Sequence, residues 1–172
     1  MILGVMSMST FTTLHVIISL IAVGSGLVVL AGMLGSHRLP GWTALFLVTT
    51  ILTSATGFLF PIHGFTPALG TGIASLVVLA IALIALYALR LAGRWRWIYV
   101  ATAVAALWFN GFVLVVQAFE KLSLLNPHAP QVGPPFPDPQ NTEFAIAQGV
   151  VLVVLLVLGI VAARKFHPAP TV

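Results

Sequence analysis

The sequence predicts an all-α, polytopic membrane helix bundle, and composition is the first of three observations that do so. Of the 172 residues, 60% are hydrophobic and only 6% are charged, and the mean hydropathy is +1.14. A soluble domain carries about 25% charged residues, so seven basic and three acidic residues are too few to cover a water-facing surface. The second observation is a set of five long apolar segments, and the third is a one-sided distribution of basic residues.

Each apolar segment is long enough to cross a bilayer, which takes about 20 helical residues. We predict one transmembrane domain over residues 1–172, with spans at 10–35, 41–62, 67–90, 96–120 and 143–164. Pro40 and Pro67 are suited to the first turn of a helix, and Pro61 is suited to end one. Glu143 fits the first turn of the last span because a carboxylate there complements the helix dipole. The first span lacks the charged start of a signal peptide, so we expect a retained helix.

Charge sets the expected orientation. Six of the seven Lys and Arg residues fall in turns on one side: Arg38, Arg90, Arg94, Arg96, Arg164 and Lys165. Lys121 and all three acidic residues fall on the other side. The positive-inside rule then places the N-terminus outside and the C-terminus inside. We expect an interfacial aromatic belt at the basic side, formed by Trp42, Trp95, Trp97 and Tyr99.

The loop at 121–142 is the one sizeable extramembrane element that we predict. It carries six of the eleven prolines, which favour extended backbone. Two functions fit it: a connector between helices, or a lid or docking surface for a membrane-protein partner on the outer face. The third span is apolar all round, so we expect it to be the most lipid-exposed helix.

Polar residues inside spans tend to face the bundle interior and mark sites. Five of them come from four spans and lie at midplane or in the outer half: His15, His63, Asn110, Gln117 and Gln148. We therefore predict a ligand-binding pocket open to the outer face. The competing interpretation is packing, because Asn and Gln form interhelical hydrogen bonds worth about 0.6 kcal/mol. Ser and Thr in spans commonly bond to backbone carbonyls.

Three chemistries fit this predicted pocket. His15 and His63 lie at similar depth on sequential spans, so they could ligate a b-type haem. A transition-metal site could add Glu120 to the same two histidines. A quinone-like lipid needs only one or two hydrogen-bonding groups in an apolar cleft, which His15 and Gln117 would supply. We assign no catalytic residue and no nucleic-acid partner, because the chain has no HExxH motif, no P-loop, no acid within a span and no basic stripe with stacking aromatics.

The segments NGFVLVVQAFEKLSLLNPHAP…PPF, LHVIISLIAVGSGLVVLAG and GWTALFLVTTILTSATGF resemble a group of small uncharacterised bacterial integral membrane proteins. The resemblance covers most of the chain. It implies a bacterial inner-membrane location and the same five-span plan. It implies no reaction, because none is established for the group.

Three functions remain open from the sequence. The first is binding of a small apolar ligand or cofactor, such as quinone or haem b, in the outer half. The second is an accessory or scaffold subunit whose outer loop 121–142 docks a partner. The third is a transporter, which we favour least because no charge within a span lines a path.

Overall fold

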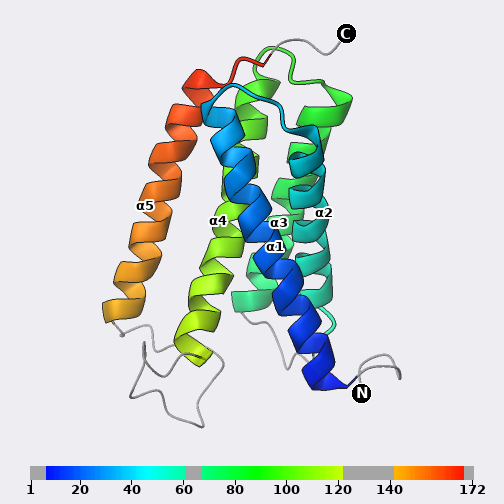
Figure 1. Cartoon of the computed structure of the whole chain (residues 1–172), viewed down its shortest axis with the longest axis vertical. Coiled ribbons are helices and arrows are strands. Elements are labelled where there is room, and N and C mark those ends of the chain that lie inside the picture. The colour runs from blue at the N-terminus through cyan, green and yellow to red at the C-terminus, as the bar shows by residue number, and fades with distance from the viewer. Residues whose placement is uncertain (1–6, 61–66, 122–141, 169–172) are drawn as a thin grey trace.

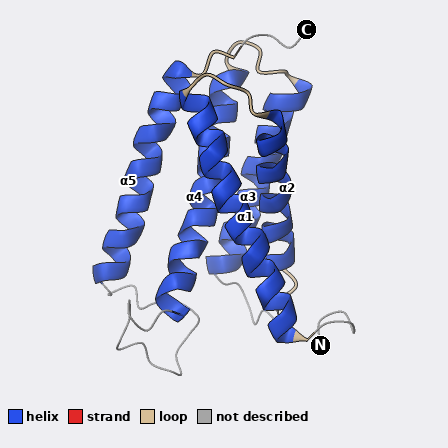
Figure 2. Cartoon of the chain, in the orientation of Figure 1, coloured by secondary structure: helices blue, strands red, loops and turns tan. Residues whose placement is uncertain are grey.

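The protein forms an antiparallel helix bundle in a computed structural model that describes residues 7–60, 67–121 and 142–168 (Figure 1). The described elements are α1 (Met8–Leu34), α2 (Pro40–Gly57), α3 (Pro67–Leu83), the π-helix η1 (Ile84–Ala88), α4 (Trp95–Lys121) and α5 (Thr142–Lys165). Those residues contain no strand (Figure 2), which confirms the all-α prediction for them.

Proline positions account for most helix starts. Pro40 and Pro67 each occupy the first position of their helix, as predicted. The helix α2 stops at Gly57, five residues before the predicted end of the second span at residue 62. The amides of Phe58 and Leu59 bond to carbonyls only three residues back, at 3.3 and 3.1 Å. A tight turn therefore replaces the helix ahead of Pro61, whose ring disfavours helical backbone at the residue before it.

Four helices are long and apolar enough to cross a membrane: Ser9–Leu34, Leu69–Ala88, Trp95–Phe119 and Thr142–Lys165. The helix α2 is not among them. It has 18 residues, about 27 Å at 1.5 Å per residue, and six are Ser or Thr. Those hydroxyls lower its hydropathy below that of its neighbours. The structure thus supports a membrane-embedded bundle, and the count of five crossings stays a prediction.

The helix α4 is central. It packs against α1, α3 and α5, while α1 also packs against α2 and α5. The core lies among α1, α2, α3 and α4 and includes Phe46, Leu79, Val100, Ala106 and Leu107. By contrast α5 is peripheral: 6% of its most apolar window is buried, against 22% for Leu69–Ala88. Our expectation that the third span is the most exposed was therefore wrong.

The basic residues gather at one end of the bundle, as predicted. That end holds the C-termini of α1, η1 and α5 and the N-termini of α2 and α4 (Figure 1). Trp42, Trp95 and Trp97 are exposed there, as an aromatic belt requires. Tyr99 was assigned wrongly to the belt, because it is only 2% exposed. Its ring packs 6.1 Å from that of Phe166, and its hydroxyl is hydrogen-bonded to Thr43.

A glycine allows α1 to approach the core closely. The sequence predicted that Ala22 and Gly26 face other helices, and both are buried. A Cβ atom added at Gly26 would lie 2.7 Å from Leu107 Cδ1 and 2.8 Å from Phe46 Cε2. The contact between α1, α2 and α4 at this level therefore depends on the missing side chain.

We predict that Gly26→Ala destabilises the bundle by about 1–3 kcal/mol, the usual cost of overpacking a filled core. The matched control is Gly24→Ala, because a Cβ at Gly24 meets no atom within 4 Å. Alanine is a better helix former than glycine, so the control should be neutral or slightly stabilising. Reversible unfolding in mixed SDS micelles measures both. Equal stability of the two variants would contradict the close approach.

Candidate functional site

Three of the predicted site residues, His15, Asn110 and Gln148, take part in separate helix–helix contacts. His15 Nδ1 lies 2.7 Å from Thr56 Oγ1 and joins α1 to α2. Gln148 Nε2 donates to the carbonyl of Phe112 at 3.0 Å and joins α5 to α4. Gln117 is half-buried on α4. His63 and the side chain of Glu120 lie outside the described residues, so the two predicted metal sites that use them stay predictions.

Asn110 joins α4 to α2 from a buried position. Its amide donates to Thr50 Oγ1 at 2.9 Å, and both side chains are almost fully enclosed. A buried amide without a partner is costly, so this bond is the reason a polar residue is tolerated at that depth. The contact fits the packing interpretation of Asn110.

The contact with Thr56 is compatible with one tautomer of His15. The Thr56 hydroxyl lies 2.6 Å from the carbonyl of Leu52, to which it can donate its single proton. In that arrangement its oxygen accepts from His15 Nδ1–H, which is the tautomer with an unprotonated Nε2. The imidazole also meets the ring of Phe60 edge-on, with centroids 5.2 Å apart. An imidazole held in this tautomer can ligate a metal or accept a hydrogen bond through Nε2.

The hydroxyls of α2 behave as the packing interpretation expects. Thr49 donates to the carbonyl of Leu45 within its own helix at 2.6 Å. Ser54 donates to Ser75 on α3 at 3.1 Å, in a buried contact. These hydroxyls form hydrogen bonds within their own helix or with a neighbouring helix, so we assign them no ligand.

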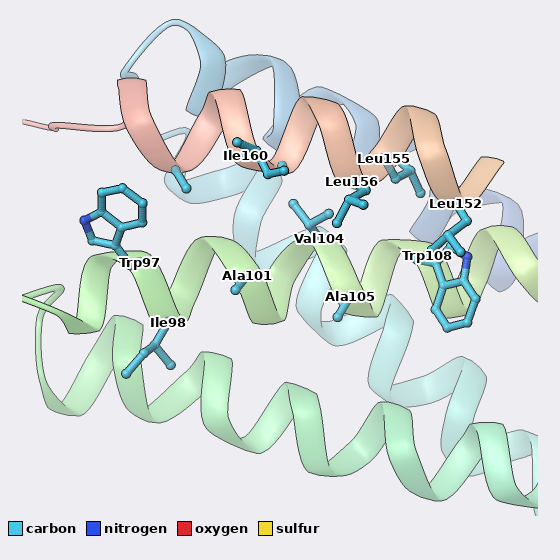
Figure 3. A pocket seen from close by; sticks show the side chains of 12 residues that line it. Trp97, Ile98, Ala101, Val104, Ala105, Trp108, Leu152, Leu155, Leu156 and Ile160 are labelled. Carbon is cyan, nitrogen blue, oxygen red and sulfur yellow. The ribbon is translucent and has the colours of Figure 1, made fainter. Parts of the chain in front are cut away.

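Sequence reasoning missed a groove between α4 and α5 with a volume of about 550 Å³ (Figure 3). Its lining from α4 is Trp97, Ile98, Ala101, Val104, Ala105 and Trp108, and from α5 is Leu152, Leu155, Leu156, Gly159, Ile160 and Ala163. The readable signal was small residues four apart on both helices, Ala101 with Ala105 and Gly159 with Ala163. We had read only Gly159 as facing the bundle.

Two buried polar atoms lie beside the Trp108 end of this groove. Trp108 Nε1 and Gln148 Oε1 have no hydrogen-bond partner among the described residues. Both residues contact Phe112: the Trp108 ring lies 5.9 Å from its ring, and the Gln148 amide bonds to its carbonyl. One atom is a donor and the other an acceptor. Buried groups of this kind call for an explanation, since each costs about 1–3 kcal/mol when it lacks a partner.

Within the described residues, no group of three or more His, Cys, Asp or Glu side chains is placed to hold a metal ion. Comparisons of the chain with protein-family models, with curated proteins and with solved structures find no match. The arguments for function therefore rest on the sequence and on this geometry.

We predict that Asn110 and Thr50 are energetically coupled across the α2–α4 contact. A double-mutant cycle with Asn110→Leu and Thr50→Val should give a coupling of about 0.6–1.7 kcal/mol, the range for interhelical hydrogen bonds in membranes. Unfolding in mixed SDS micelles gives the four free energies. A cycle between Asn110 and Thr49, whose hydroxyl bonds within its own helix, is the control and should show additivity.

Proposed function

We propose that the protein crosses the bacterial inner membrane five times, with the N-terminus outside and the C-terminus inside. Four described helices of membrane length support a membrane location. The helix α2 runs antiparallel between α1 and α3 and connects their ends, which supports a fifth crossing. The six basic residues at one end of the bundle support the orientation, because that end is expected to face the cytoplasm.

We further propose that the protein binds a small lipid-like molecule with an apolar chain and one polar head, of the quinone-like class. The observation that carries this proposal is the α4–α5 groove with a donor and an acceptor buried beside one end. The lining is apolar except for its two indoles, which suits a hydrocarbon chain. A carbonyl oxygen on the head group supplies the acceptor that Trp108 Nε1–H lacks.

Among the predicted cofactors, this groove fits quinone better than haem. Its lining contains no histidine, methionine or other axial ligand side chain for haem iron. The haem alternative depends instead on His15, whose Nδ1 lies 2.7 Å from Thr56 Oγ1. That site also needs a second ligand, for which the sequence offered His63.

A second candidate function is that of a subunit in a membrane complex. The favouring observation is α5, which packs against α4 and α1 and leaves most of its apolar surface outward. Its exposed side chains include Ile146, Val150, Val153, Leu156 and Val157. A transmembrane helix of a partner would cover this face without new polar contacts. The outer loop 121–142 remains the other proposed docking element.

The ligand proposal is tested by organic extraction of the purified protein, with quantification of quinone and lipid per chain. Trp108→Phe removes the indole donor and keeps a ring, and Ala101→Leu fills the groove; both should lower the bound quinone at least about tenfold. Ala80→Leu is the matched control, because Ala80 is also exposed but lies on α3 outside the groove.

Bound quinone that is equal in all four proteins would contradict the groove as its site. An extract without stoichiometric quinone or other small lipid would contradict the ligand proposal and favour the subunit. A visible spectrum of the same sample distinguishes haem, which gives a Soret band that should disappear in His15→Ala. Haem without quinone would move the binding site from the groove to His15.

The orientation is tested with single cysteines, because the natural chain has none. Ser9→Cys lies at the start of α1, and Ala92→Cys lies in the turn before α4 at the basic end; both positions are exposed. In intact spheroplasts, a membrane-impermeant maleimide should label Ser9→Cys alone. Ala92→Cys should react only after the membrane is permeabilised. The reverse pattern would contradict the proposed topology.

A further inference from the structure

A second cavity, of about 470 Å³, opens at the basic end of the bundle and differs in chemistry from the α4–α5 groove. Its lining includes two arginines, Arg38 and Arg90, and one histidine, His37. Three further lining side chains carry hydroxyls: Thr43, Tyr87 and Tyr99. The remaining lining is apolar and reaches the core: Val29, Met33, Leu39, Pro40, Leu86 and Phe166.

An irregular backbone forms one wall of this cavity. The π-helix η1 carries Tyr87 and ends with a bond from Leu89 N to the carbonyl of Ile84 at 2.9 Å. Arg90 and Leu91 follow with φ of 49° and 60°, conformations that cost non-glycine residues about 1–2 kcal/mol each. Leu91 is buried and anchors the turn, which leaves Arg90 at the rim. Single π-turns occur frequently at functional sites, so this geometry accompanies the cluster rather than arising at random.

The opposite wall is the turn between α1 and α2. Ser36 has φ of 61°, and its hydroxyl accepts from the His167 amide at 2.8 Å, which fixes the turn against the end of α5. Arg38 follows and lines the cavity together with Tyr99. The N-cap residue Leu39 has no capping side chain, so the positive end of the α2 dipole also faces this region.

Among the described residues, the lining of this cavity contains no carboxylate side chain. Two arginines, the first residues of α2, and tyrosine and threonine hydroxyls therefore line the same cavity. Guanidinium groups bind phosphate oxygens through paired hydrogen bonds, and hydroxyls can add a further contact.

We propose that this cavity is a phosphate-binding site, with Arg38 and Arg90 as the binding cations. Its place at the basic end fits the phosphate of an anionic phospholipid, because basic pockets between transmembrane helices on the cytoplasmic side bind such head groups. The apolar inner wall suits the glycerol and the first methylenes of the acyl chains. Free phosphate shares the same chemistry and is the other source. This site is independent of the quinone-like ligand proposed for the α4–α5 groove.

The experiment uses the full chain in phosphatidylcholine nanodiscs at physiological salt, with phosphatidylglycerol added in steps. Native mass spectrometry counts the phosphatidylglycerol retained per chain, and the same titration is run with inorganic phosphate alone. We expect saturable retention of phosphatidylglycerol. The double variant Arg38→Gln/Arg90→Gln should weaken it at least about tenfold, because charge-assisted hydrogen bonds are lost.

The matched control is Arg94→Gln/Arg164→Gln, which removes the same charge from exposed positions at the same end that do not line the cavity. It should change retention by less than about threefold, since screened surface charges contribute little at this salt. Arg38→Lys/Arg90→Lys keeps the charge but loses the planar fork, and should fall between the wild type and the glutamine variant.

Equal losses in the cavity variant and the control would overturn the proposal, because general attraction between the basic end and anionic lipid would then explain the binding. The absence of saturable binding to either probe would also overturn it. Competition by inorganic phosphate would support the same site with a soluble ligand, and lipid binding without such competition would support the head group. Circular dichroism tests whether each variant is folded. If the double variant does not fold, the single variant Arg90→Gln replaces it in the binding experiment, because Arg90 is exposed.

Discussion

The fold depends on helix contacts that must form without a hydrophobic driving force, because an apolar solvent surrounds apolar helices. Close approach through small residues then decides which helices meet. Gly26 admits α1 to within contact of Phe46 and Leu107, and Gly159 receives Val104 of α4 at 3.0 Å from the position of its absent Cβ. Single hydrogen bonds, such as that from Asn110 to Thr50, add specificity at these contacts. The most extensive helix contact is that of α1 with α2, and α4 makes extensive contacts with both α3 and α5.

The two cavities are formed by different parts of the chain. Between α4 and α5, small side chains such as Ala101, Ala105 and Ala163 line the groove together with bulkier residues of both helices. At the basic end the turns, rather than the helices, define the space, and the irregular backbone after η1 sets its wall. Both cavities are spaces that side-chain packing between the elements leaves empty. A change in helix packing would therefore alter both of them.

The positions where helices begin could be predicted from local sequence, whereas the question of which helices pack against one another could not. Pro40 and Pro67 marked helix starts correctly, and the spacing of Ala22 and Gly26 marked the buried face of α1, because these signals act within one helix. Tyr99 was misplaced since its burial depends on Phe166, a residue that follows α5 and is distant in sequence. The exposure of α5 was missed for the same reason: α3 and α5 are similarly apolar, and only the packing order separates them.

The polar groups are distributed differently at the two ends of the bundle, so the two ends differ in the ligands that they could bind. His15, Asn110 and Gln148, which suggested an outer-half site in the sequence, each have a protein partner on another helix. Much of their hydrogen-bonding capacity is thus used in holding helices together, and the predicted outer pocket depends on His63 and the loop beyond the described residues. The basic end differs because the acidic residues all belong to the far ends of α4 and α5 and the loop between them. The described lining of the cavity at the basic end holds two arginines and no carboxylate, which is the composition that the phosphate proposal uses.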